Sequence, residues 1–249
     1  MTDGWLLYML AVPAVILLGL SKGGFAGMGA LAMPMLALVV DPVRAAAILL
    51  PILIAQDAVG VWAFRRSVDW RLIGWMMPGA LLGVWLGYVF AASLSAATVM
   101  TMVGAISITF GLYRLWAARH AAPVAVRRWP EWVGTLLGVV SGYTSQIAHA
   151  GQPPFQVWVL PRGLPRDVLV GTTALFFAAL NWIKVPAYLA LGQFSPQNLI
   201  VSAALFPLAI AATFAGVWLV RRVPAERFYT AIYCLMVAVG VALIWEAAA

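Results

Sequence analysis

The chain is a succession of long apolar runs separated by short polar connections. The runs cover residues 5–20, 26–40, 44–64, 72–90, 98–116, 131–148, 153–160, 168–191, 197–220 and 228–247. A helix needs about 20 residues to cross a bilayer. The runs are continuous and not alternating, which argues against a transmembrane β-barrel. The pattern predicts an all-α polytopic membrane protein with some eight to ten apolar segments.

Composition supports this fold class. Of the 249 residues, 64% are hydrophobic and only 9% are charged, whereas soluble domains have roughly 45–50% apolar and about 25% charged residues. The same values exclude a disordered chain. Cys234 is the single cysteine, so a disulfide scaffold is excluded as well.

The net charge of +7 does not indicate nucleic acid as a partner. The basic residues are scattered over short loops and form no stripe with interleaved aromatic residues. In a membrane protein, loop arginines are topology signals, and acidic lipids are their ordinary partners. No Cys or His cluster suggests a metal, and we expect no cofactor.

Two polar stretches interrupt the apolar pattern. SKGGFAGMG (21–29) separates the first two runs, and SQIAHAGQPP (145–154) separates the run at 131–148 from that at 153–160. Glycine-rich backbone is poor material for a lipid-facing helix. We therefore interpret each pair of runs as a hairpin of short or broken helices that enters the membrane and returns.

The two breaks belong to an internal repeat that divides the chain into residues 1–120 and 121–249, within one integrated membrane domain. Ser21 and Ser145, Gly27 and Gly151, Asp57 and Asn181, and Phe64 and Tyr188 are each 124 residues apart. Each half has a broken hairpin followed by three long helices. A repeat of this size is typical of transporters.

The loop charges predict how the halves are oriented. Connections rich in arginine should face the cytoplasm. The basic connections contain Arg65, Arg66, Arg71, Arg114, Arg119, Arg127, Arg128, Arg162, Arg166, Arg221, Arg222 and Arg227. One threading places all of them inside: both hairpins return to the side they came from, and both termini lie outside. The second half is then inverted relative to the first, in the cell's inner membrane.

A few polar side chains fall inside membrane segments. Lys22 and Lys184 are the only lysines, and Asp57, Asn181 and His149 also fall within or between apolar runs. A charge at the bilayer centre costs about 2.5–3.5 kcal/mol. Such residues face a cavity or pair with one another, and these lysines and Asp57 leave one net positive charge. Freed amides at half-helix N-termini also attract anions, so the sequence predicts an anion site.

The candidate residues fall into two groups. The candidate substrate-binding residues are Ser21, Lys22, Gly23, Gly24, Gly27, Ser145, Gln146, His149, Gly151, Gln152, Asn181 and Lys184; the candidate coupling or charge-pairing residues are Gln56 and Asp57. We expect Gly23, Gly24, Gly27 and Gly151 to line one cavity at mid-membrane depth with His149 and Gln152. The alternative for Asp57 is a structural ion pair with a lysine, and for Gln56 and Asn181 it is interhelical hydrogen bonding.

These motifs resemble the sulfite exporter TauE/SafE family. The resemblance rests on GLSKGGFAGMGALAMPML (19–36), DPVRAAAILLPIL (41–53), VDWRL (68–72), SGYTSQIAHAGQPP (141–154), LPRDVLVGTTALFFAALNWIK (164–184) and GQFSPQNL (192–199). It implies transport of small sulfur-containing anions, often outward. The second break departs from the family pattern, because many members have a run of glycines where this chain has HAGQPP.

Four other functions are weighed against anion export. Import of small organic anions coupled to protons or sodium leaves the same sequence features. Ser145 and His149, four residues apart, could be a nucleophile and a base of an intramembrane hydrolase, but no third orienting group accompanies them. An accessory subunit without transport activity is another possibility. GLSKGG has the wrong spacing for a phosphate-binding loop, which argues against ATP-driven transport by this chain. The sequence does not predict the oligomeric state.

Overall fold

The computed structural model describes residues 4–25, 27–91, 93–119, 129–220, 222 and 226–248, with the backbone alone at 226–228. The described residues are helical and contain no strand, which confirms the all-α class. The elements are α1 (Gly4–Lys22), a 3₁₀ turn (Met28–Leu31), α2 (Ala32–Ala37), α3 (Pro42–Phe64), α4 (Trp70–Ala91), α5 (Ala96–Arg119), α6 (Glu131–Ala148), α7 (Gln152–Val159), a second 3₁₀ turn (Leu160–Arg162), α8 (Arg166–Ala190), α9 (Pro196–Leu219) and α10 (Glu226–Ala248).

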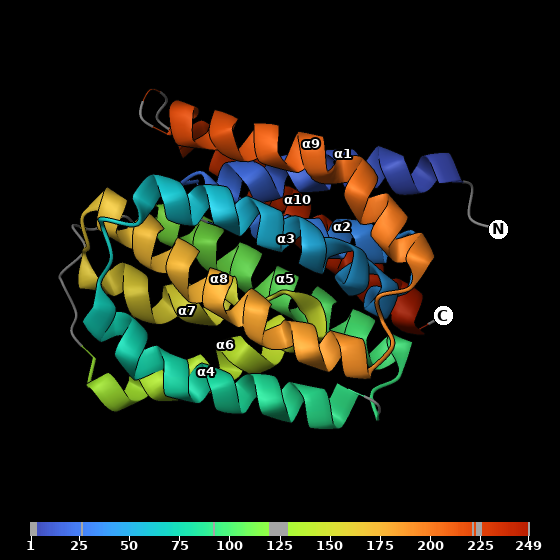
Figure 1. Cartoon of the computed structure of the whole chain (residues 1–249), viewed down its shortest axis with the longest axis horizontal. Helices are drawn as coiled ribbons and strands as arrows, with labels where there is room; N and C mark the ends of the chain where they lie inside the picture. Colours follow the sequence, from blue (N-terminus) through green and yellow to red (C-terminus); the bar gives the residue numbers. More distant parts are fainter. Residues whose placement is uncertain are drawn as a thin grey trace.

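Seven described helices are long and apolar enough to cross a membrane: α1, α3, α4, α5, α8, α9 and the Tyr229–Ala248 part of α10. The helices α2, α6 and α7 complete the bundle. Figure 1 shows that the long helices lie side by side along the longest axis of the molecule. The chain is thus a polytopic membrane protein, as its apolar pattern predicts.

Local sequence fixes where several helices begin. Asp41 precedes Pro42, and its carboxylate accepts a hydrogen bond from the Val43 amide at 2.8 Å. Ser195 precedes Pro196 and accepts from the Asn198 amide at 3.2 Å. A polar cap followed by proline is the ordinary start of a helix, because the cap satisfies a free amide and proline has none to satisfy.

The two predicted breaks are real interruptions of the helices. After α1, Gly24 and Gly27 have φ angles of 130° and 99°, which side chains with a Cβ rarely adopt. After α6, His149 caps the helix with a φ of 50°, and its amide bonds to the Ser145 carbonyl at 3.1 Å. Each break is followed by a short helix that turns back, so each half begins with the predicted hairpin.

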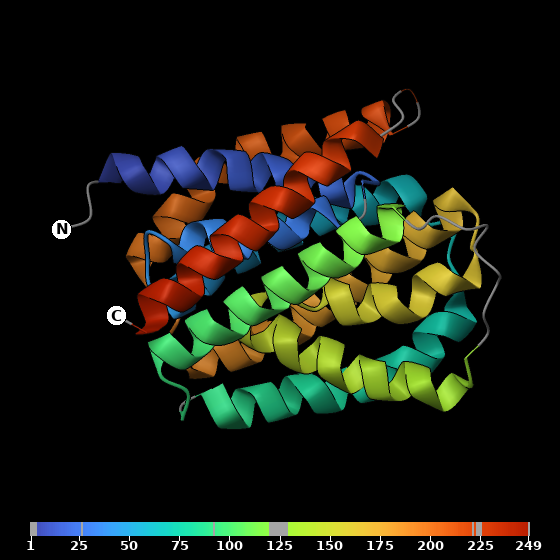
Figure 2. The same cartoon turned by 180° about the vertical axis from the view of Figure 1, so that it is seen from behind.

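The halves share their order of elements and pack across each other. Helix α1 packs along α9, α4 along α6, α3 along α8 and α5 along α10, so each of these pairs joins a helix of residues 1–120 to one of residues 121–249. Matching helices of the two halves run in opposite directions, as the views in Figures 1 and 2 agree. This is the arrangement that inverted repeats would have.

Arginines collect at one end of the bundle. The C-terminal ends of α3, α5 and α9 and the N-terminal ends of α4, α6, α8 and α10 lie there, and we name it the arginine end. Its described arginines are Arg65, Arg66, Arg71, Arg114, Arg119, Arg162, Arg166 and Arg222; Arg127, Arg128, Arg221 and the side chain of Arg227 lie outside the described residues. The first turn of α1 and the last turn of α10 lie at the opposite end, which we name the terminal end (Figure 1).

We predict that the terminal end faces the outside of the cell, because arginine-rich ends stay in the cytoplasm. In a Cys234→Ser background, needed because Cys234 is exposed, a cysteine at exposed Ser93 should react with an impermeant maleimide in intact cells. A cysteine at exposed Asp167, in the first turn of α8, should react only after the membrane is opened. The reverse labelling pattern would contradict this orientation.

Small residues allow the cross-half pairs to approach closely. A Cβ added at Gly79 or Gly83 of α4 would overlap the α6 carbonyl oxygens of Thr135 or Val139. A Cβ added at Gly23, just after α1, would overlap Gly216 of α9. Membrane helices associate through such close contacts, because lipid gives them no hydrophobic reason to pair.

Candidate functional site

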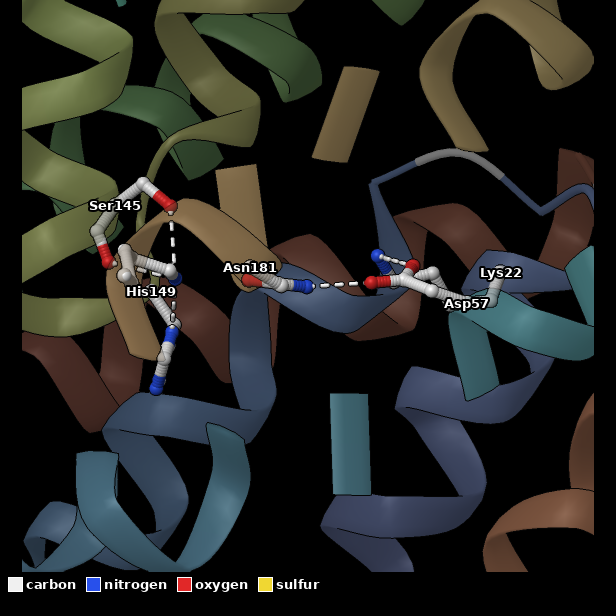
Figure 3. Close-up of polar contacts among 6 residues, drawn as sticks. Lys22, Asp57, Ser145, His149 and Asn181 are labelled. Carbon is white, nitrogen blue, oxygen red and sulfur yellow. Dashed lines mark hydrogen bonds and ion pairs between the residues drawn. The ribbon is translucent and has the colours of Figure 1, made fainter. Parts of the chain in front are cut away.

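A buried ion pair lies between α1, α3 and α8. Lys22, the last residue of α1, donates to one oxygen of the Asp57 carboxylate in α3. The amide nitrogen of Asn181 in α8 donates to the other oxygen at 2.6 Å. All three side chains are at least nine-tenths buried. Figure 3 shows the carboxylate held between these two donors.

A second polar cluster surrounds Lys184, one turn after Asn181 on the same face of α8. The Lys184 ammonium donates to the backbone carbonyl and to the hydroxyl of Ser145, both at 3.1 Å. It also lies 2.8 Å from Nδ1 of His149, whose Nε2 lies 2.8 Å from the Ala46 carbonyl oxygen. A carbonyl only accepts, so Nε2 carries the proton and Nδ1 accepts from Lys184. All three donors of Lys184 are thus used by neutral acceptors.

The interior contains more basic than acidic side chains, and it carries a net positive charge when both lysines are protonated. The described part of the chain buries three lysine or carboxylate side chains: Lys22, Asp57 and Lys184. Only one of them is an anion, and no carboxylate among the described residues lies within ion-pair distance of Lys184. A buried charge without a partner costs several kcal/mol, and a bound anion would remove that cost.

A small cavity of about 30 Å³ separates the two clusters. Its lining comes from both breaks and from α8: Leu18, Ser21, Lys22, Gly29, Ala30, Leu53, Ser145, His149, Ala150, Gln152, Pro153, Phe177 and Asn181. Two side-chain oxygens are buried there without a partner among the described residues: the Ser21 hydroxyl and the amide oxygen Oε1 of Gln152. A water needs about 10–15 Å³ of such space, so the cavity has room for about two waters.

The four glycines do not line this cavity, although Gly24 lines a smaller one with Gln152. Each of the four glycines packs against a neighbour. Gly23 contacts α9, and Gly24 contacts Val220. Gly27 contacts the Tyr233 hydroxyl, and Gly151 contacts the Ser141 carbonyl. These glycines are required for close packing at the breaks, and the cavity is lined by the polar side chains beside them.

The two breaks reach into the bundle from opposite ends, and residues of both line shared cavities. Gly24 lies beside Val220, the C-cap of α9, and therefore near the arginine end. His149 contacts Ala46 in the second turn of α3, near the terminal end. Each hairpin thus extends past the middle of the bundle, and the cavity lies between the two breaks.

Two glutamines predicted for the site lie apart from the cavity. Gln56 donates to the Val15 carbonyl at 3.1 Å and joins α3 to α1. Gln146 lines a separate small cavity with Tyr188, whose hydroxyl donates to the Gln146 backbone carbonyl at 3.0 Å. Phe177 is a lining residue that the sequence analysis missed; its ring centroid lies 5.5 Å from the Lys22 ammonium. An apolar residue in an apolar helix gives no signal of such a role.

The geometry does not support the hydrolase alternative. The Ser145 hydroxyl bonds to Lys184, and both ring nitrogens of His149 have other partners. No hydrogen bond between the Ser145 and His149 side chains occurs in the described structure, so the nucleophile has no base next to it.

The fold and site define the class of protein: a polytopic helical membrane protein with a charged, polar cavity between two broken hairpins. A model of the family "Sulfite exporter TauE/SafE" matches residues 11–243. The chain therefore belongs to the TauE/SafE family, whose members are membrane anion transporters and not enzymes. No curated protein and no solved structure gives a significant match.

Proposed function

We propose that the chain transports small sulfur-containing oxyanions, of the sulfite, sulfonate or thiosulfate type, out of the cell. Family membership supports this substrate class. The observation that carries the proposal is the polar cavity lined by Lys22, in an interior where two buried lysines accompany a single buried carboxylate. In a low-dielectric interior such an excess attracts an anion much more strongly than it would in water.

The cavity supplies the hydrogen bonds that an oxyanion accepts. Lys22 offers an ammonium, Asn181 an amide and Ser21 a hydroxyl without a described partner. Charge-assisted hydrogen bonds to ionised oxygens are roughly twice as strong as neutral ones. A sulfite or sulfonate head group, with several oxygens on one sulfur, can accept from these donors at once.

The position of the breaks supports alternating access between two ends. One break lies toward the arginine end and the other toward the terminal end, with the cavity between them. The cavity is smaller than a sulfur oxyanion, so the site has to widen when a substrate binds. Movement of one hairpin would open the site to one end and movement of the other hairpin to the opposite end, as in transporters built from inverted repeats.

The membrane potential supports the outward direction. An anion that leaves a negative-inside cell gains about 2.3 kcal/mol per charge per 100 mV. Export of such an anion needs no other ion gradient, whereas import against the same potential needs coupling to protons or sodium.

Flux measurements in vesicles of the purified protein test the proposed function. Sulfite, thiosulfate and methanesulfonate should cross faster than acetate or chloride. Lys184→Met should weaken anion binding roughly tenfold, because a nearby buried charge contributes about 1–2 kcal/mol. The melting temperature should stay unchanged or rise, because Lys184 has no described carboxylate partner. Exposed Arg166→Met is the control, and absence of flux for every anion would contradict the proposal.

A further inference from the structure

The Asp57 carboxylate is bound as a substrate anion would be bound. Its two oxygens take one donor each, the Lys22 ammonium and the Asn181 amide, contributed by different helices. Both donor residues line the cavity. A carboxylate presents two oxygens on one carbon, and a sulfonate or sulfite presents a similar pair of oxygens on one sulfur. The same two donors therefore fit either anion.

Hydrogens remain on Lys22, Asn181 and Ser21, but the charge of Lys22 is balanced by Asp57 while that carboxylate is ionised. Lys184 uses all three of its hydrogens on Ser145 and His149. Lys22 is the only lysine that lines the cavity. Its ammonium is already paired with the Asp57 carboxylate. The free space of about 30 Å³ holds about two waters. An oxyanion with four or more heavy atoms does not fit there while the carboxylate stays in place.

We propose that the Asp57 carboxylate occupies the substrate position in the empty transporter, and that the oxyanion takes its place only when Asp57 carries a proton. This inference rests on the proposed function. A displaced carboxylate would be buried without its cation, which costs several kcal/mol. A proton on Asp57 removes its negative charge, so the Lys22 ammonium is left to balance the substrate anion.

The groups around Asp57 are consistent with a single protonation step. Lys22 faces it from α1, and Lys184 from α8 and His149 from the end of α6 are the next ionisable groups in the interior. Helices α2 and α9 also pack on α3 and contain no ionisable residue. The Arg114 side chain of α5 donates a hydrogen bond to the Tyr233 hydroxyl and not to Asp57. Asp57 is thus the acidic side chain of this interior.

The proton carried by Asp57 determines how much net charge crosses the membrane with the substrate. One proton cancels one unit of substrate charge, so a monoanion crosses with no net charge and a dianion crosses with one negative charge. The outward drive of the membrane potential is then limited to a dianion such as thiosulfate. A monoanion such as methanesulfonate moves outward only when its own concentration gradient and that of the co-transported proton together favour export.

Methanesulfonate is the probe for binding, because it stays ionised between pH 5 and pH 8. The affinity of the unaltered protein should fall as the pH rises from 5 to 8, by up to about tenfold per pH unit, since each bound anion takes up one proton. Asp57→Asn should bind at pH 8 at least roughly tenfold more tightly than the unaltered protein, with no dependence on pH. Exposed Asp167→Asn is the matched control and should behave as the unaltered protein does.

Currents across vesicle membranes give a second measurement. In the unaltered protein, thiosulfate flux should generate a current and methanesulfonate flux should not; in Asp57→Asn both should. The unaltered protein alone tests the proposal if the variant fails to fold. Binding that is independent of pH, a methanesulfonate current in the unaltered protein, or a pH dependence that persists in Asp57→Asn would each overturn it. Absence of methanesulfonate binding at pH 5 in both proteins, together with no flux of any sulfur oxyanion, would instead contradict the proposed function.

Discussion

The Lys22→Met variant should lose measurable anion binding and about 3–5 kcal/mol of stability, because removal of one partner leaves the other buried charge unpaired. Lys22 is the cation that lines the cavity, and the Asp57 carboxylate would keep only the Asn181 amide as a donor. Melting temperature in detergent and binding of methanesulfonate should be measured on the same preparation.

The double variant Lys22→Met/Asp57→Asn separates stability from binding. It removes both charges and keeps an amide to pair with Asn181, so most of the lost stability should return, as it does when buried ion pairs are replaced by neutral groups. Anion binding should remain absent. A folded double variant that binds methanesulfonate as tightly as the unaltered protein does would show that Lys22 is no part of the site.

Gly79→Ala should destabilise the protein by about 3 kcal/mol or more, since overpacking of this kind costs 1–3 kcal/mol where neighbours can shift and more where they cannot. The added Cβ would overlap the Thr135 carbonyl oxygen, a backbone atom of α6 that has no freedom to move away. Thermal unfolding in detergent would measure the loss.

Gly74→Ala is the matched control, because Gly74 lies on the same helix α4 and an added Cβ meets nothing within 4 Å. Alanine is the better helix former by about 1 kcal/mol, so this variant should keep or slightly raise the melting temperature. Equal stability of the two variants would contradict the close contact between α4 and α6.

Sequence periodicity was enough to predict the helical class and the two breaks, and the ion pair of Asp57 with Lys22 is the alternative that the sequence left open for that carboxylate. Asp57 and Asn181 were first matched as repeat partners 124 residues apart, and their side chains are hydrogen bonded to each other. Residues that an inverted repeat relates to each other can touch only where they lie near the axis of that repeat. The spacing of residues therefore already contained part of the site.

The roles of the glycines and the environment of Lys184 could not be predicted in the same way. The sequence does not distinguish a glycine that lines a cavity from one that contacts a neighbouring backbone. Gly23 contacts α9, which lies almost 200 residues later in the chain. Lys184 is satisfied by a backbone carbonyl, a hydroxyl and an imidazole. None of these groups carries a formal charge, so charge counting does not find them.

The glycine contacts between helices of different halves determine which parts of the molecule can travel together. Backbone touches backbone between α4 and α6 at Gly79, Gly83, Gly138 and Gly142, and between α1 and α9 at Gly19 and Gly216. If one half moved as a rigid body relative to the other, α4 would have to slide along α6 and α1 along α9 where their backbones are in contact. We therefore expect α1 to move with α9 and α4 with α6, each pair assembled from both halves of the chain; Gly104 and Gly240 join α5 to α10 in the same way. Displacement of either hairpin then carries a long helix of the opposite half with it, which links the state of one gate mechanically to that of the other.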